Sequence, residues 1–86
     1  MNNLAHAVAL ASIGWYLMMP PIRGGRPDQS ESLTLWERVA SFDSAQECED
    51  YKSRVHARMQ KRDAASAKDF MSSACIASDD PGLKPR

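Results

Sequence analysis

The sequence predicts an α+β fold, in which a small two- or three-stranded sheet is covered by a helical hairpin. The 86 residues suffice for one small domain. A strongly marked helix start lies near residue 44, a break in the apolar pattern near residue 62 divides the helical region, and short β-prone segments flank it. The two cysteines, Cys48 and Cys75, lie in the helical region and in the last β-prone segment.

The composition limits the classes of function. Eleven basic residues balance eleven acidic ones, so the chain lacks the positive surplus that binding to nucleic acid requires. A hydrophobic fraction of 43% argues against a disordered chain. A chain of this length buries only about 60–65% of its unfolded surface, so a covalent staple would help its core.

The N-terminal part is apolar. We interpret residues 1–13 as a leader and 14–84 as the domain. The apolar segment Leu4–Met19 is shorter than the ~20 residues of a membrane span, but it fits the apolar region of a secretory signal. Met1–Asn3 lacks a basic residue, whereas Ala9–Ala11 has the small-x-small form of a cleavage site. The segment is therefore a degenerate export signal, an uncleaved membrane anchor through residues 4–19, or a buried part of the domain.

Two strands are predicted before the helices. Trp15–Met19 is aromatic and apolar, and Pro20-Pro21 ends it in a polyproline turn. Ile22–Ser32 is rich in Gly, Pro, Asp and Ser and is predicted to be a loop. Leu33–Phe42 is predicted to be the second strand and to make the central aromatic contacts of the sheet. One face of this strand is expected to carry Trp36, Arg38, Ala40 and Phe42.

The first helix has the clearest start signal in the chain. Ser44-Ala45-Gln46-Glu47 has the spacing of a capping box, in which the side chains at both ends satisfy free backbone groups of the first turn. Asp50 and Arg54 are spaced for an ion pair one turn apart. An apolar stripe recurs at three and four residues from the start of the helix. Its members are Ala45, Cys48, Tyr51, Val55 and Met59.

A second helix follows a break in this stripe. Arg62-Asp63 would point into the apolar face if one helix continued, and a new apolar set begins at Ala67. We predict helices over 44–62 and 65–73 in a hairpin, with Ser66 as a cap of the second. The helical hairpin is expected to contribute Ala45, Val55, Met59, Phe70 and Met71 to the core. The aromatic residues Trp15, Tyr16, Trp36 and Phe42 are also expected in the core.

The cysteines constrain the helices conditionally. One straight helix from Cys48 to Cys75 would separate them by about 40 Å at ~1.5 Å per residue, whereas a disulfide needs Cα atoms within ~7 Å. A bridge would close a loop worth about 3–4 kcal/mol in the chain-entropy model. A structural disulfide, two buried thiols, and a redox or metal site are the alternatives. Cys75–Ser78 is the predicted third strand, and Asp79–Gly82 a turn.

Several segments together resemble a group of small, uncharacterised exported bacterial proteins. The resemblance spans most of residues 14–84, and it implies export to the periplasm or envelope and a Cys48–Cys75 bridge, but no activity. The chain departs from the group in its leader, where a conventional signal peptide is usual, and at Gly82, where an arginine is expected. The segments that carry the resemblance are Gly14–Pro21, Trp36, Ser41–Ala45, Cys48-Glu49 and Cys75–Pro81.

No catalytic, cofactor or metal residues are predicted. His56 lies two helical turns from Cys48, too far for a nucleophile and base on one helix. Asp79-Asp80 precedes a proline, where a turn is favoured over a cation site. The basic ridge of Arg54, Arg58 and Lys61 is interpreted as a solvated helix face.

The predicted function is therefore that of a small exported domain with a structural or partner-binding role in the bacterial envelope. We expect it not to be an enzyme, to need no cofactor, and to bind an unknown protein partner, if any, but no nucleic acid. The alternatives are a membrane-tethered accessory protein, in which residues 4–19 alone contact the membrane, and a small thiol-redox protein that uses Cys48 and Cys75.

Overall fold

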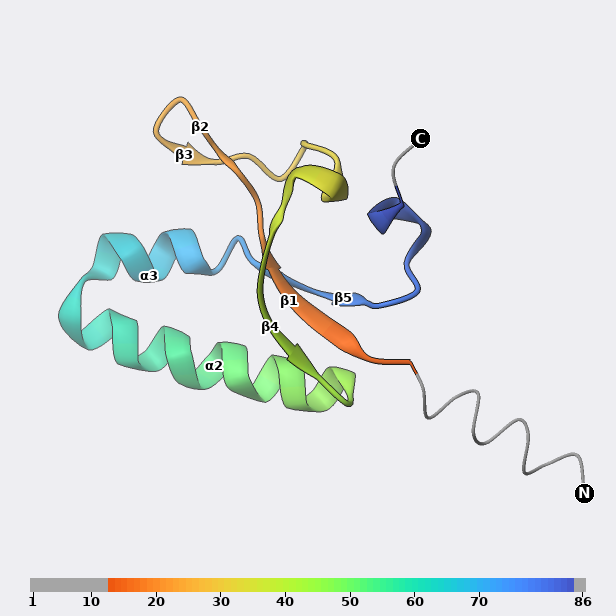
Figure 1. Ribbon diagram of the computed structural model, residues 1–86. Helices are drawn as coiled ribbons and strands as arrows, with labels where there is room; N and C mark the ends of the chain where they lie inside the picture. The colour runs from red at the N-terminus through yellow and green to blue at the C-terminus, as the bar shows by residue number, and fades with distance from the viewer. Residues whose placement is uncertain (1–12, 85–86) are drawn as a thin grey trace, which may run out of the picture.

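A three-stranded antiparallel sheet and a helical hairpin form the two layers of the computed structural model, as predicted (Figure 1). The structure describes residues 13–84, so most of the leader lies outside it. The strands are β1 (Trp15–Met19), β2 (Ile22–Arg23), β3 (Arg26–Pro27), β4 (Glu37–Phe42) and β5 (Ala74–Ala77). The helices are α2 (Ala45–Arg62) and α3 (Ala64–Phe70), with 3₁₀ turns η1 (Leu33–Leu35) and η2 (Pro81–Leu83).

The central strand of the sheet is β1. The strand order is β4-β1-β5, so β4 is an edge strand, and of the aromatic contacts predicted for residues 33–42 the structure shows the one between Phe42 and Tyr51. Trp15–Met19 carries no charged side chain and has a neighbour on both edges, whereas β4 begins with Glu37 and Arg38, which suit an exposed edge. Leu17, in the middle of β1, is completely buried.

The predicted second strand is shorter and less regular than expected. Its first residues, Leu33–Leu35, form η1, because the Ser32 hydroxyl accepts a hydrogen bond from the Thr34 N–H. Farther along, the register with β1 shifts, so that Leu17 pairs with Ala40 but Met18 with Arg38. This β-bulge moves Arg38 to the sheet face opposite Ala40, which corrects the predicted alternation.

The displaced arginine has a partner on that face. The Arg38 guanidinium lies 3.9 Å from the centre of the Tyr16 ring, a cation–π geometry. Tyr16 is half-buried there, on the sheet face away from the helices, and is not part of the core under the helices. Trp36 is also half-buried, and its indole N–H donates to the Glu31 carbonyl at 2.9 Å. The prediction that all four aromatic residues enter that core is therefore wrong for these two.

The predicted loop over 22–32 contains a small hairpin. β2 and β3 pair across Gly24 and Gly25, which have φ values of 60° and 84°. Two consecutive residues with positive φ are what a two-residue hairpin turn needs, and glycine adopts them without a Cβ clash. An ion pair at 3.1 Å joins Arg23 to Glu31 and fixes the segment that follows the hairpin.

The start of α2 is as predicted. The Ser44 hydroxyl accepts from the Glu47 N–H at 3.1 Å and donates to the Glu47 carboxylate at 3.0 Å. The predicted ion pair between Asp50 and Arg54 is absent within the described residues, since Asp50 accepts a hydrogen bond from the Gln46 amide at 2.9 Å instead.

The hairpin between α2 and α3 depends on Asp63. This residue ends α2 and caps α3, in place of the predicted Ser66, because its carboxylate accepts from the N–H groups of Ala65 and Ser66 and from the Ser66 hydroxyl. Helix α3 ends at Phe70, three residues before the end predicted for the second helix at residue 73.

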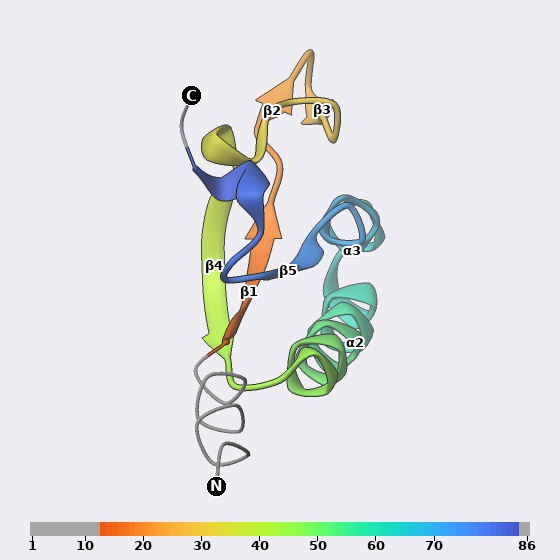
Figure 2. The same ribbon diagram turned by 90° about the vertical axis from the view of Figure 1, so that its right-hand side faces the viewer.

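Both helices lie on the same side of the sheet (Figure 2). Leu17, Cys48 and Phe70 form the buried centre between the layers, and the rings of Phe42 and Tyr51 meet at 5.2 Å. Met71 is 50% exposed, so its predicted place in the core is wrong; it follows the end of α3. The partly buried residues packed around the centre are Trp15, Phe42, Tyr51, Val55, Met59 and Cys75.

Replacing the central leucine tests this core. We expect Leu17→Ala to lower the free energy of unfolding by about 2–5 kcal/mol, because it leaves a cavity between the layers. Leu35→Ala is the matched control, since Leu35 is 54% exposed and a surface change costs within about 0.5 kcal/mol. Urea denaturation followed by circular dichroism measures both, and equal losses would contradict the assignment of Leu17 as the centre.

The Asp63 cap predicts a pH dependence. Hydrogen bonds from Ser66 and Ala65 hold the pKa of Asp63 below its usual 3.8. The folded state therefore binds this proton less readily than the unfolded state, and the stabilisation is complete above the usual pKa and lost as the pH falls through the lowered one. Asp63→Asn keeps a capping oxygen without the charge. We expect it to be less stable than wild type at pH 7, with a difference that shrinks towards pH 3 in thermal denaturation; a constant difference would contradict this account.

Candidate functional site

The disulfide between Cys48 and Cys75 is present, and it joins the two layers. Cys48 lies in the first turn of α2, and Cys75 lies in β5 directly opposite Leu17 of β1. The Cα atoms are 6.1 Å apart, within the range of ordinary disulfides. The helical hairpin therefore brings together Cys48 and Cys75, the two residues that the sequence analysis singled out.

The position of this bond favours a structural role over thiol chemistry. Thiol–disulfide exchange requires a thiolate to reach one of the sulfur atoms, and Cys48 is completely buried. Cys75 is half-buried and packs against the same core cluster. The arrangement can therefore hold α2 against the sheet, but it offers little access to an attacking thiol.

Polar contacts beside the disulfide hold the segment between α3 and β5. The Lys52 ammonium donates to the Ser73 carbonyl at 2.6 Å, and the buried Ser73 hydroxyl donates to the Phe70 carbonyl at 2.6 Å. The Gln29 amide donates to the Ser72 carbonyl at 3.0 Å. The sequence analysis missed the contacts of Lys52 and Gln29, because no spacing rule joins positions so far apart in the chain.

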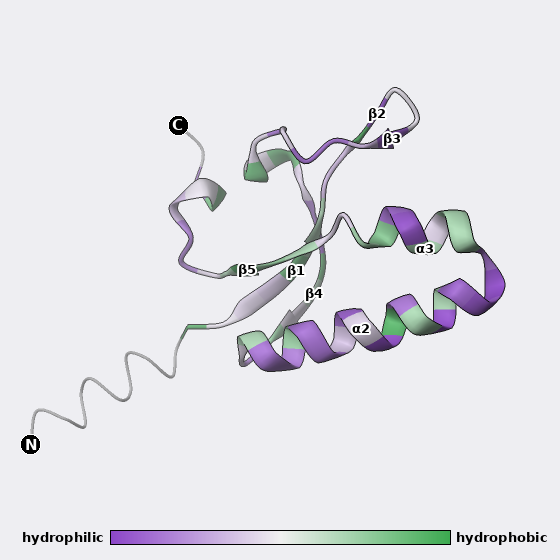
Figure 3. Cartoon of the chain, turned by 180° about the vertical axis from the view of Figure 1, so that it is seen from behind, coloured by the Kyte–Doolittle hydropathy of each residue, from purple (hydrophilic) through white to green (hydrophobic). Residues whose placement is uncertain are grey.

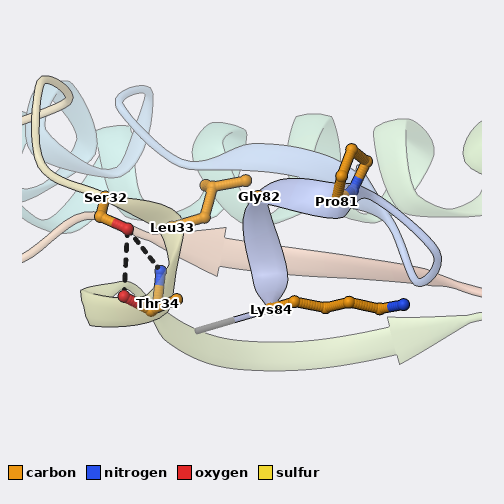
Figure 4. A pocket seen from close by; sticks show the side chains of 6 residues that line it. All are labelled: Ser32, Leu33, Thr34, Pro81, Gly82 and Lys84. Atoms are coloured by element: carbon orange, nitrogen blue, oxygen red, sulfur yellow. Dashed lines mark hydrogen bonds between the residues drawn. The ribbon is translucent and has the colours of Figure 1, made fainter. Parts of the chain in front are cut away.

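A hollow lies between η1 and η2 (Figure 4). It has a volume of about 600 Å³. Gly82 allows the two turns to approach, since a Cβ atom there would lie 2.9 Å from Leu33 Cδ1. The hydroxyls of Ser32 and Thr34 are 3.0 Å apart and bond to each other. The lining residues are Ser32, Leu33, Thr34, Pro81, Gly82 and Lys84.

This hollow has little chemistry to offer. Its lining includes no carboxylate, imidazole or thiol, and its one charged group is the Lys84 ammonium. General acid–base and nucleophilic catalysis can also use a hydroxyl or an amine, but the Ser32 and Thr34 hydroxyls bond to each other, and no carboxylate or imidazole lines the hollow to act as their base. The hollow is thus a surface depression next to a packed pair of turns.

The other residues singled out by the sequence lie apart from one another. His56 is half-buried on α2, and Cys48, two helical turns away, is in the disulfide. Asp80 accepts from the Gly82 N–H at 2.7 Å and so starts η2, as expected of a turn former. Residues 13–84 hold no group of three or more side chains suited to a metal ion. The ridge residues Arg54, Arg58 and Lys61 are exposed on α2.

Two exposed carboxyl groups have lowered pKa values, and both belong to caps or turns. The Ser30 hydroxyl and N–H lower the pKa of Asp28 in the segment after the hairpin, and Ser66 does the same for Asp63 at the start of α3. Since both carboxyl groups serve neighbouring backbone groups, these shifts reflect local structure and not a reactive cleft.

Comparison with protein-family models, with curated proteins and with solved structures finds no match to this chain. Among the helices of the described part, none is long and apolar enough to cross a membrane. The Cys48–Cys75 bond is compatible with an oxidising location.

Removing the disulfide tests its structural role. We expect the double variant Cys48→Ala and Cys75→Ala to lose about 2–5 kcal/mol of stability, because its unfolded chain is no longer cross-linked. Chemical denaturation of the variant and of the oxidised wild type gives the difference. An insulin-reduction assay with dithiothreitol is the companion measurement, and we expect no acceleration by the wild type. The structural role would be contradicted if the wild type accelerated insulin reduction and the double variant lost that activity while keeping the stability of the wild type.

Proposed function

We propose that this chain is a small exported domain of the bacterial envelope, with a structural or partner-binding role and no catalytic activity. The Cys48–Cys75 disulfide carries the proposal. Disulfides persist in the periplasm and outside the cell, whereas cytosolic thiols are kept reduced. A small domain with few completely buried side chains is the type of protein that gains most from such a bond.

The surroundings of the titratable residues support a binding or structural role. The basic ridge residues Arg54, Arg58 and Lys61 of α2 are exposed, and the acidic residues with lowered pKa values cap turns. An active site would need such groups to converge in a water-excluding pocket, and the hollow between η1 and η2 brings only Lys84 to its wall. We therefore infer that the domain acts through contacts with another molecule.

The alternatives fit this arrangement less well. A thiol-redox protein needs an accessible sulfur, and Cys48 has no exposed surface. A tethered accessory protein would use residues 4–19 as its anchor, but Trp15–Met19 form β1, so the part of this segment that the structure describes is committed to the sheet. Residues 4–12 lie outside the described residues.

Intact mass after expression with export tests the proposal. We expect protein recovered from the periplasm to resist alkylation before reduction, to lie two hydrogens below the reduced chain in mass, and to have lost its leader. The same chain retained in a reducing cytosol is the control, with both thiols alkylated. Freely alkylated Cys48 and Cys75 on an uncleaved chain from the periplasmic fraction would overturn export and the disulfide together.

A further inference from the structure

Helix α2 extends beyond the sheet that it covers. Its C-terminal half and the turn into α3 project past the strands of the three-stranded sheet, as seen in Figure 1 and from behind in Figure 3. The apolar stripe of α2 becomes less buried in the same direction, since Cys48 is completely buried, whereas Val55 and Met59 are only half-buried. The side of α2 that packs on the sheet near its start is therefore partly open towards its end.

A second hollow, which we call the α2 hollow, lies along this open part of the helix. It has a volume of about 320 Å³ and is lined by Val55, Arg58, Met59 and Arg62, all of which belong to α2. The two apolar residues are half-buried and the two arginines are exposed, so apolar side chains form the floor and guanidinium groups the rim. Such a site suits a ligand that carries an apolar group beside an anionic one.

The arginines of this rim belong to a longer row. Arg54, Arg58 and Arg62 recur every four residues along one flank of α2, and we call them the arginine row. Residues at this spacing are neighbours on the helix surface, and like charges there destabilise a helix slightly. The helix dipole favours cations in the last turn only, so it accounts for Arg62 but not for the two arginines before it. The row thus carries a folding cost that the helix itself does not offset.

The carboxylates at either end of the arginine row are engaged elsewhere. Before the row, Asp50 accepts a hydrogen bond from the Gln46 amide at 2.9 Å, and Glu47 belongs to the capping box. After the row, Asp63 caps α3. Within residues 13–84, none of the three arginines forms an ion pair with a carboxylate. The row is therefore a strip of positive charge that the described part of the chain leaves uncompensated.

We propose that the arginine row and the α2 hollow bind an acidic, amphipathic helix of a partner protein. This inference names the class of partner for the binding role proposed above, and it rests on that role. Val55 and Met59 are also four residues apart, so α2 presents an apolar row beside the charged one. A partner helix with carboxylates in one row and apolar side chains in the next, at the same spacing, would pair with the guanidinium groups and fill the hollow.

A protruding helix fits this surface better than an anionic membrane does. The apolar floor is half-buried between exposed arginines, so a flat lipid surface would meet the charges first, whereas a single apolar side chain can enter the hollow. Eleven basic residues balance eleven acidic ones in the whole chain, which gives no general attraction to anionic lipid. From Arg54 to Arg62 the arginine row spans about 12 Å at ~1.5 Å per residue, a length that two turns of a partner helix match.

Titration with a designed peptide, followed by NMR, tests the proposal. The probe is an alanine-rich peptide of about 18 residues, long enough to form a helix, with glutamates and leucines in two adjacent rows at four-residue spacing. It is added to the isotope-labelled full-length chain with its native disulfide. At low salt we expect the amide signals of residues 54–62 to shift most, and salt to weaken the binding, because the contacts are charged. A peptide with lysines in place of the glutamates is the control, and we expect it to cause no such shifts.

Removal of one charge at matched positions locates the binding. We expect Arg58→Gln to bind the acidic peptide about fivefold more weakly. Its melting temperature should not fall, because the change also removes the like-charge neighbours of Arg54 and Arg62. Arg26→Gln is the matched control, since Arg26 is an exposed arginine on β3, and we expect it to bind as the wild type does.

The result that overturns the proposal is defined for each arm. A wild type whose signals do not shift with the acidic peptide, equal binding of the lysine peptide, or equal weakening by Arg58→Gln and Arg26→Gln overturns it. Binding to phosphatidylglycerol vesicles but not to the acidic peptide also overturns it, in favour of a membrane surface. The titration uses purified protein and does not depend on export, so its failure is distinct from a failure of the proposed location, which intact mass tests.

Discussion

The covalent bond between Cys48 and Cys75 is the constraint on which the rest of the structure depends. It fixes the first turn of α2 against β5, beside the buried Leu17. Few side chains between the layers are fully buried, so hydrophobic contact alone leaves a small stabilisation to offset the entropy of the chain. A cross-link reduces the conformational entropy of the unfolded chain, so it lowers the entropy cost of folding.

The bond also determines what the short strand β5 can do. Four residues are a short strand, and hydrogen bonds to β1 alone would leave it free to fray. The disulfide holds its middle, and Lys52 holds the preceding carbonyl of Ser73 from the helix layer. The disulfide and the Lys52 hydrogen bond thus support the register that β5 has with β1.

Local signals predicted several local parts of this fold, and pairing between distant segments accounts for the error in the second strand. The capping box at Ser44 formed as expected, because its donor and acceptor lie within one turn. The bulge that moves Arg38 to the other face arises from pairing with β1, which nothing near Arg38 reveals. The cap at Asp63 prevailed over Ser66 because its carboxylate reaches three donors, a geometry that appears only once α2 has ended there. The disulfide was the one element of the candidate site that the sequence singled out, because cysteines are few and their pairing geometry is strict.

The two edges of the sheet, β4 and β5, differ in charge and regularity. On β4, the bulge and the charges of Glu37 and Arg38 discourage pairing, and of these features the local sequence reveals only the charges. On β5, the absence of charge would be a liability for aggregation if the strand could shift, since a smooth edge accepts any register. The cross-link fixes β5 against the first turn of α2, so the bond that stabilises the domain also limits the freedom of this strand to shift.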